Sequence, residues 1–361
     1  MRPKIIPVFI PHLGCVNDCI YCDQKKITGI EHKISNRKIR KTIDLYLLKI
    51  FSDYPNISSR NIQIAFYGGN FTGLDISHQE SLLEISKSYV ERGSVGSVRI
   101  STRPDFLDQK KLIFLKERYV KTIEIGVQSL DDSVLAISGR NYSSRVVYDS
   151  FNLLRDNHFQ IGIQIMLGLP GDTFESLKST IKKIINWKPD FVRLYPTLVI
   201  KGTPLEKLYK ERKYNPMNLD EVISLCKIIL LNLEINNIPV IRLGLHPSFS
   251  LLDKIIDGPF HPSLKYLVKS EIDYDLMNLI FRKYKREVCN SVIFYIPEKS
   301  LSEFRGFKRK NILRIKERFK INNIDFVEKK EIKQGNLIAS FDNKEIKMSQ
   351  KDLMYQNDYS L

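Results

Sequence analysis

The chain has 361 residues, of which 43% are hydrophobic and 27% charged, and its 57 Lys and Arg against 41 Asp and Glu give a formal net charge of +16. A chain of this length buries a hydrophobic core without disulfides, which excludes intrinsic disorder, collagen and small disulfide-rich scaffolds. No apolar stretch approaches the roughly 18 residues of a membrane span, and no signal-peptide cleavage site follows the basic N-terminal residues. We therefore expect a cytoplasmic protein without membrane attachment.

Short apolar runs alternate with helical patterns over the first two thirds of the chain. Six runs have the composition of strands, at residues 5–10, 62–68, 97–102, 122–129, 160–168 and 191–197. Between them lie four segments of helical periodicity, each beginning near a Ser, Thr or Asp that can cap a helix, at residues 77–93, 109–120, 143–157 and 173–187. This alternation indicates βα units around a parallel sheet.

Most of the predicted strands have one apolar and one polar face. In the run 160–168, for example, Ile and Leu occupy the odd positions, whereas Gln160 and Gln164 occupy even ones. A closed eight-stranded barrel fills its interior with Val, Ile and Leu, so a polar inner face predicts an open, partial (β/α)6 barrel that holds a ligand. The alternative is an open sheet whose polar face carries an internal ion-pair network, such as Arg99 with Glu124.

The pattern changes after residue 245. A helix at about 266–285 is followed by a strand at 288–296, a basic segment, and two strands near 324–331 and 336–342. We predict an α/β protein with a barrel domain over residues 1–245 and a small α+β (βαββ) accessory domain over residues 246–361.

The basic segment 305–320 contains eight Lys or Arg and one acidic residue, Glu317. It is predicted to form one helix, with Ile312, Leu313, Ile315 and Phe319 available for packing. Two interpretations of its charge remain open: a solvated lysine-rich face, or a surface that contacts the phosphate backbone of a nucleic acid.

Three of the five cysteines, Cys15, Cys19 and Cys22, lie within eight residues in the loop that follows the first predicted strand. A tight local group of thiols in a cytosolic protein favours a metal site over a disulfide framework. Cys226 and Cys289 stand alone in apolar segments and are predicted to be core residues.

Two metal centres fit the C-x3-C-x2-C spacing. Three thiolates can hold three irons of a [4Fe-4S] cluster and leave the fourth iron open for an exchangeable ligand. The alternative is zinc with His12 as the fourth ligand, although structural zinc normally joins two separated ligand pairs. A reactive thiol is a third interpretation.

This spacing, with the aromatic Tyr21 before the last cysteine, resembles the signature of the radical S-adenosylmethionine (radical SAM) superfamily. The resemblance implies that Cys15, Cys19 and Cys22 ligate a [4Fe-4S] cluster whose open iron binds the amino and carboxylate groups of S-adenosylmethionine. One electron from an external reductant would then split this cofactor into methionine and a 5′-deoxyadenosyl radical. The resemblance also implies an oxygen-sensitive protein.

Further positions match the cofactor site of the superfamily. The turn at 67–73 resembles its GGE-like turn, with an asparagine in place of the acidic residue. The resemblance and the strand faces predict these cofactor-binding residues: Tyr21, Gly68, Gly69, Asn70, Ser101, Arg103, Gln128, Arg140, Gln164 and Tyr195. The turn at 168–173 resembles the loop that borders the adenine, but a strand-to-helix turn capped by Asp172 or Thr173 explains it as well. No catalytic acid or base is assigned, and four other ionisable residues are predicted to be structural: Glu124, His246, His261 and Glu271.

Within the superfamily, residues 193–209 and the segments flanking the cysteines resemble the elongator catalytic subunit, which modifies a tRNA wobble uridine. The resemblance covers residues 4–245 and does not extend to the acetyltransferase domain of that subunit. It suggests a tRNA base as the substrate. The alternatives are a small-molecule or tetrapyrrole radical oxidoreductase, and a non-catalytic iron–sulfur or RNA-binding protein. Against the tetrapyrrole alternative, Gln24 stands where coproporphyrinogen dehydrogenases have a further cysteine.

Overall fold

The computed structural model describes residues 3–10, 12–15, 19–24, 27, 35–247, 249–284, 290–341, 344–356, 359 and 361. The chain forms two compact units: unit 1 comprises Met1–Met217 and Leu245–Pro259, and unit 2 comprises Asn218–Gly244 and Phe260–Leu361. These units are discontinuous along the chain, whereas the sequence predicts continuous domains over 1–245 and 246–361. Those domain assignments stay predictions.

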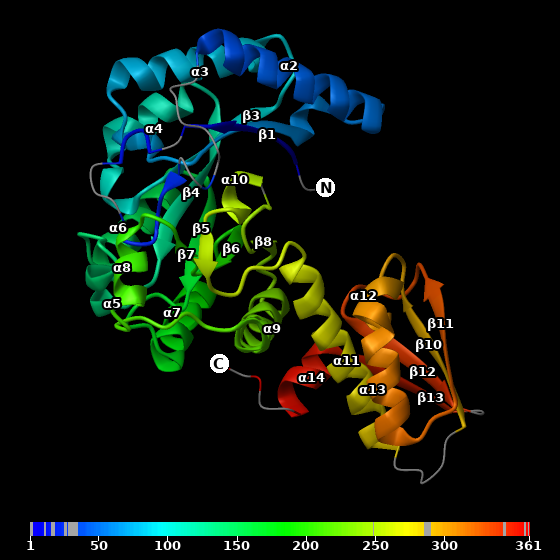
Figure 1. Cartoon of the computed structure of the whole chain (residues 1–361). Helices are drawn as coiled ribbons and strands as arrows, with labels where there is room; N and C mark the ends of the chain where they lie inside the picture. Colours follow the sequence, from blue (N-terminus) through cyan, green and yellow to red (C-terminus); the bar gives the residue numbers. More distant parts are fainter. Residues whose placement is uncertain are drawn as a thin grey trace. The chain divides into compact units, whose positions relative to one another are not determined.

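The larger sheet is a parallel half-barrel (Figure 1). Its first six strands follow the chain order: β1 (Lys4–Phe9), β2 (Ile62–Tyr67), β3 (Ser97–Thr102), β4 (Val120–Gln128), β5 (Gln160–Leu167) and β6 (Phe191–Pro196). A seventh strand, β8 (Val240–Leu243), comes next to β6 in the sheet order. The predicted fold class is confirmed, with seven strands where the sequence predicts six, because a run of four residues is a weak strand signal.

Helices connect these strands, and most begin at a capping residue. They are α2 (Asn36–Asp53), α3 (Ile76–Glu91), α4 (Gln109–Lys116), α5 (Asp132–Ile137), α6 (Ser144–Asp156), α7 (Phe174–Trp187), α8 (Pro204–Lys210) and α10 (Phe249–Leu252). Thr173 caps α7 through reciprocal hydrogen bonds with Ser176, so the cap predicted for the turn at 168–173 is present. The short strands β7 (Val199–Ile200) and β9 (Ile255–Asp257) pair in an antiparallel manner.

The polar inner face of the sheet carries an ion-pair network. Arg99 Nε lies 2.9 Å from Glu124 Oε1, Arg193 also pairs with Glu124, and the Tyr67 hydroxyl donates to Glu124 Oε1 at 3.2 Å. The ion pair between Arg99 and Glu124 that the sequence suggested for an open sheet is therefore present within the half-barrel. Glu124 is 2% exposed. Its three partners, two of which are arginines, compensate the negative charge of this buried carboxylate.

Unit 2 contains a four-stranded sheet in the order β11-β10-β12-β13. Its elements are α9 (Leu219–Ile235), α11 (Leu264–Tyr284), β10 (Ser291–Pro297), α12 (Leu301–Arg305), α13 (Lys310–Phe319), β11 (Asn323–Lys329), β12 (Asn336–Phe341), β13 (Lys344–Ser349) and α14 (Gln350–Gln356). Helices α11 and α13 cover one face of this sheet (Figure 1). The predicted strands after residue 285 are observed, whereas β13 and α14 were not predicted. Cys226 is fully buried in α9, as predicted, and Cys289 lies outside the described residues.

The basic segment 305–320 is not one helix, contrary to the prediction. Helix α12 ends at Arg305, and α13 begins only at Lys310, because Gly306, Lys308 and Arg309 have φ angles of 73°, 50° and 61°. Left-handed backbone interrupts a right-handed helix.

Packing of the basic segment follows the prediction in part. Ile315 is fully buried and Phe319 stacks on Phe281 with ring centroids 4.7 Å apart. Leu313 is 62% exposed, contrary to the prediction. Arg314 binds Glu271 at 2.8 Å, so this pair is structural.

Asp273 of α11 makes the stability of unit 2 dependent on pH. Burial raises the pKa of its carboxyl well above the usual 3.8, with Glu303 adding to the effect and Lys269 opposing it. Since the folded state binds this proton more tightly than the unfolded chain, the contribution of Asp273 is most favourable below pH 3.8 and falls as pH rises toward the folded-state pKa. Asp273→Asn is expected to remove this fall and to raise Tm at pH 7 by about 2–4 °C, the shift that roughly 1 kcal/mol gives in a domain of this size.

Thermal unfolding at several pH values tests this expectation. Asp275→Asn is the matched control, because the Asp275 carboxylate lies 2.5 Å from Lys227 Nζ and its loss should lower Tm. A Tm difference between Asp273→Asn and the wild type that stays constant from pH 4 to pH 8 would contradict the prediction.

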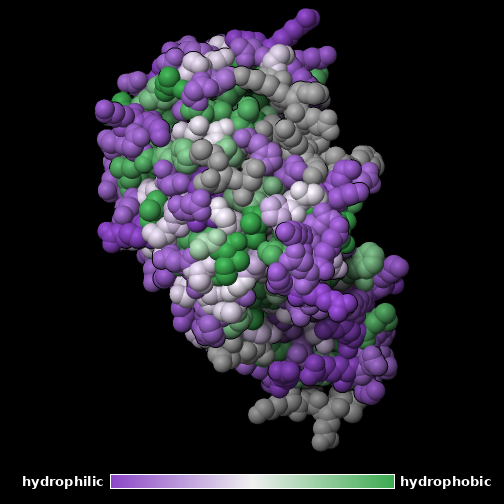
Figure 2. Space-filling model, turned by 60° about the vertical axis from the view of Figure 1, so that its left-hand side comes forward, coloured by the Kyte–Doolittle hydropathy of each residue, from purple (hydrophilic) through white to green (hydrophobic). Residues whose placement is uncertain are grey.

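The surface is mainly polar. In the face shown in Figure 2, hydrophilic surface predominates and hydrophobic patches are interspersed. Exposed apolar side chains include Leu45 and Leu48 of α2, which are 57% and 70% exposed. Among the helices of the described residues, none combines the length and apolar character that crossing a bilayer requires.

Candidate active site

The cysteine loop leaves β1 at the carboxyl edge of the sheet, where parallel-barrel enzymes hold their substrates. It is bonded to the turn after β2: the His12 N–H donates to Gly68 O and the Asn70 N–H donates to Leu13 O, both at 2.9 Å. A Cβ on Gly69 would lie 2.5 Å from Leu13 O, so only glycine allows this approach. Gly69 therefore positions the cysteine loop, a role that sequence reasoning missed.

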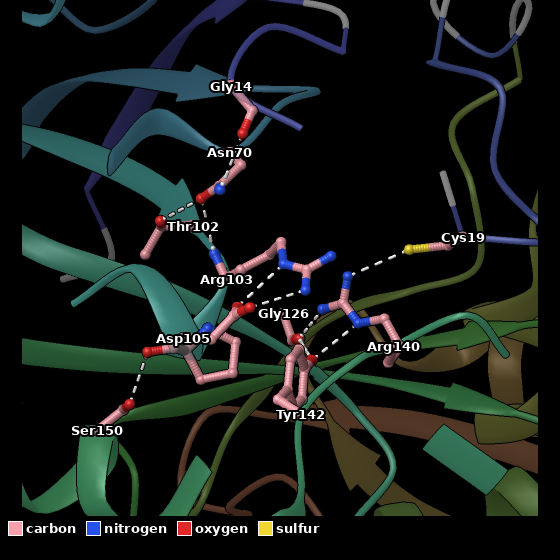
Figure 3. Close-up of polar contacts among 11 residues, drawn as sticks. Gly14, Cys19, Asn70, Thr102, Arg103, Asp105, Gly126, Arg140, Tyr142 and Ser150 are labelled. Atoms are coloured by element: carbon pink, nitrogen blue, oxygen red, sulfur yellow. Dashed lines mark hydrogen bonds and ion pairs between the residues drawn. The ribbon is translucent and has the colours of Figure 1, made fainter. Parts of the chain in front are cut away.

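Asn70 joins the cysteine loop to the end of β3 (Figure 3). Its Nδ2 donates to Gly14 O at 3.0 Å, and its Oδ1 accepts from Thr102 Oγ1 at 2.7 Å and from the Arg103 N–H at 3.1 Å. The side chain is 1% exposed. An amide suits this position because it both donates and accepts, whereas an ionised carboxylate only accepts.

All three thiols of the loop are free of disulfides. Cys19 is buried, and Cys15 and Cys22 are partly buried. Burial raises the pKa of Cys15 and, to about 12, that of Cys22; Cys19 adds to both effects and Arg140 opposes them. A metal that binds these sulfurs must therefore displace protons. Within the described ranges no three His, Cys, Asp or Glu side chains are gathered around a metal position, so the fit to a cluster rests on the thiol donors and the groups around them.

His12 fits poorly as the fourth ligand of a zinc ion. Its Nε2 accepts a hydrogen bond from the Gln24 N–H at 2.6 Å and lies 3.8 Å from Asp23 Oδ1. This bond uses the Nε2 lone pair, which disfavours zinc coordination through that nitrogen. The Gln24 side chain also donates to Cys22 Sγ at 3.4 Å, so the residue at the position of the extra cysteine in coproporphyrinogen dehydrogenases contacts the third cysteine.

Two buried arginines lie beside the ring of Tyr142 (Figure 3). Arg103 donates from Nε and Nη2 to the two carboxylate oxygens of Asp105, at 3.0 and 2.8 Å. Arg140 donates to Tyr142 Oη at 2.8 Å and to Cys19 Sγ at 3.2 Å, and it also contacts Gly126 O. The structure thus brings Arg140 to a cysteine sulfur, an arrangement that the sequence did not predict.

Three of the predicted cofactor-binding residues carry buried polar atoms that lack a hydrogen-bond partner within the described part of the chain: Tyr21 Oη, Ser101 Oγ and Arg103 Nη1. A buried unsatisfied polar atom costs about 1–3 kcal/mol, which a polar ligand at this edge would offset. S-adenosylmethionine offers a carboxylate, an amino group and ribose hydroxyls. The residues present therefore fit this cofactor.

Two predicted residues, Gln128 at the end of β4 and Gln164 in the middle of β5, contact each other. Gln164 Nε2 donates to Gln128 Oε1 at 3.3 Å. Gln128 has a φ of 68° at a register shift in the pairing of β4 with β5. Non-glycine residues with such backbone cluster at functional sites.

Comparison with known proteins places these observations in a family. The radical SAM superfamily profile matches residues 9–184, and the radical SAM C-terminal domain profile matches residues 189–274. The chain belongs to the radical SAM superfamily.

Relatives of this radical SAM protein match only part of its length. The tRNA uridine(34) acetyltransferase of Methanocaldococcus infernus is 28% identical over 192 residues, covering 47% of this chain and 36% of the relative. The uncharacterized protein MJ0486 of Methanocaldococcus jannaschii is 30% identical over 232 residues, covering 61% of this chain and 69% of the relative. The chain thus spans about a third of the acetyltransferase that it matches. The structure of Methanocaldococcus infernus Elp3 shares the fold, with a TM-score of 0.58 at 19% identity over 79% of this chain and 65% of that one.

Three other residues singled out in the sequence of this radical SAM protein contact groups within the chain. The Tyr195 hydroxyl contacts Arg193, so it belongs to the network around Glu124. His261 Nδ1 accepts from the Ser263 N–H at 3.1 Å, and His246 Nδ1 lies 2.8 Å from the neighbouring Pro247 O.

Sequence reasoning also missed Asp105 and Tyr142, which hold the two arginines. Both stand two residues after the arginine that they contact. That short spacing was the signal available in the sequence.

Proposed function

We propose that this protein binds a [4Fe-4S] cluster through Cys15, Cys19 and Cys22 and cleaves S-adenosylmethionine reductively. The cluster, when bound by these three thiols, would supply one electron and an open iron for the cofactor, and the cleaved cofactor would supply the radical chemistry that removes a hydrogen atom from a substrate. The observation that carries this proposal is the set of three free thiols on one loop, beside buried polar atoms at the same sheet edge that have no partner among the described residues.

The residues around the thiols have distinct tasks in this proposal. Gly69 and Asn70 hold the cysteine loop against β2 and β3. Ser101 Oγ and Arg103 Nη1 offer hydrogen-bond donors to the cofactor hydroxyls and carboxylate, and Asp105 orients the Arg103 guanidinium for this. An apolar wall excludes water from the reactive edge; it includes Tyr21, Val134, Met166, Leu169, Val199 and Leu205.

Anaerobic reconstitution with iron and sulfide tests the proposal. We expect about four irons per chain and, after dithionite reduction with S-adenosylmethionine, formation of 5′-deoxyadenosine measured by liquid chromatography. Omitting either dithionite or S-adenosylmethionine should abolish the product. An intact cluster without 5′-deoxyadenosine would favour the non-catalytic iron–sulfur alternative instead.

We further propose a tRNA base as the substrate and a cytoplasmic location, where tRNA is present. Support comes from the relatives, one of which is a tRNA uridine(34) acetyltransferase, and from the basic side chains of unit 2. Exposed lysines and arginines occupy the turn between α12 and α13 and the end of α13; they are Arg305, Lys308, Arg309, Lys310, Arg318 and Lys320. Acetyl transfer is not part of the proposal, because the match covers 36% of that relative.

The turn at 308–310 is expected to contact RNA phosphates. If each of its three cations releases about one counterion, replacing all three by Gln should reduce the slope of log Kd against log salt by up to roughly 2–3. Lys110, Lys116 and Lys121, which are exposed on α4 and β4, provide a matched triple control that keeps the wild-type slope. Filter binding of unmodified tRNA between 50 and 300 mM salt measures both. If the wild type, the variant at 308–310 and the control variant have equal slopes, the turn at 308–310 does not contact RNA phosphates.

A further inference from the structure

Arg140 is a buried cation beside the cysteine loop. It follows α5 and is 5% exposed. Its guanidinium donates to Tyr142 Oη at 2.8 Å, to the Gly126 carbonyl, and to Cys19 Sγ at 3.2 Å. Burial raises the pKa of Tyr142 to about 12, so this hydroxyl stays neutral and provides no counter-charge.

The contacts of Arg140 differ from those of the other buried or half-buried arginines on the inner face of the half-barrel. Arg103 has Asp105 as its carboxylate partner, and Arg99 and Arg193 share Glu124. In the part of the chain that the structure describes, the contacts of Arg140 are a hydroxyl, a carbonyl and a sulfur, with no carboxylate among them. A buried cation is costly unless an anion compensates it. The Cys19 sulfur, 3.2 Å from the Arg140 guanidinium, is a ligand of the proposed cluster, and such a ligand sulfur carries negative charge.

We propose that Arg140 is the counter-ion of the Cys19 thiolate and that it sets the reduction potential of the proposed cluster. This inference rests on the proposed function, since it requires a cluster on Cys19. Hydrogen bonds to the sulfur ligands are among the factors that tune iron–sulfur potentials. Reduction adds one negative charge to the cluster, so a fixed cation at a ligand sulfur stabilises the reduced form more than the oxidised form. Arg140 is thus a positioning and charge-compensating residue that eases the entry of the electron.

The test is a redox titration of the reconstituted cluster, followed by electron paramagnetic resonance without S-adenosylmethionine. Leaving out this cofactor separates an effect on the cluster from an effect on cofactor binding. Arg140→Gln removes the charge and keeps a hydrogen-bond donor. We expect the ratio of reduced to oxidised cluster at a given potential to fall about tenfold, which equals about 59 mV for a one-electron couple. Arg140→Lys, which keeps the charge without the planar fork, should shift the potential by less.

Arg193→Gln is the matched control, because it removes a half-buried arginine, 19% exposed, from the same sheet face, and the hydrogen bonds of that arginine go to Glu124 and Tyr195. Its potential should equal that of the wild type. Circular dichroism and iron content verify that each variant is folded and loaded. If Arg140→Gln assembles no cluster, the Arg140→Lys variant is used instead. A cluster in Arg140→Lys that has the full iron content and a reduction potential below that of the wild type supports the inference.

A wild-type potential in the loaded Arg140→Gln variant, or in Arg140→Lys where only that variant loads, would overturn the inference while leaving the proposed function intact. Failure of the wild type to assemble any cluster would instead overturn the proposed function. A shift of the same size in Arg193→Gln would also overturn the inference. It would show that the loss of any arginine from the inner face of the half-barrel lowers the reduction potential.

Discussion

Replacing Cys19 by alanine is expected to reduce bound cluster and 5′-deoxyadenosine formation to the level of the protein-free control. The remaining sulfurs, Cys15 and Cys22, would leave two irons of the cluster without protein ligands. The substitution also removes the sulfur that faces Arg140 at 3.2 Å. Iron and acid-labile sulfide assays, with the absorbance near 400 nm, measure the loss of cluster.

Cys226→Ala is the control for this experiment. Cys226 is a thiol that is fully buried in α9 of unit 2, and alanine leaves no unsatisfied polar atom there. This variant should bind wild-type iron and form 5′-deoxyadenosine at the wild-type rate. Iron loss in Cys226→Ala, or full iron in Cys19→Ala, would show that the ligand set proposed above is wrong.

Asn70→Asp is expected to destabilise unit 1 and to release the cysteine loop. The amide Nδ2 donates to Gly14 O at 3.0 Å, and an ionised carboxylate would place an oxygen against that carbonyl in a site that is 1% exposed. An uncompensated buried charge of this kind costs about 3–5 kcal/mol. We expect a lower midpoint of urea unfolding and iron loading below half of the wild-type value.

Asn311→Asp separates the loss of iron from the loss of stability. Asn311 is also 1% exposed, and its Nδ2 donates to Ser270 O at 2.8 Å, but it belongs to unit 2. It should lose comparable stability and retain its iron. If both variants load iron equally, Asn70 does not position the cysteine loop.

The local features of the site were predictable because they depend on neighbours in the sequence. The period of two along each strand placed Arg99, Glu124 and Arg193 on one face of the sheet, where they form ion pairs. Strand β8 and strand β13 were not predicted, since one has four residues and the other few apolar ones. The break of the basic segment at Gly306 was also missed, because helix periodicity continues across it while the backbone does not.

The sequence by itself determined which side chains the candidate site can offer: three thiols at fixed spacing, and strands with one apolar and one polar face, are properties of adjacent residues. Only the tertiary structure decided which distant groups meet. Cys19 and Arg140 are 121 positions apart, and Asn70 reaches Gly14 across 56 positions. Such contacts arise because parallel strands bring successive loops to one edge, where burial forces each polar group to find a partner or to await a ligand.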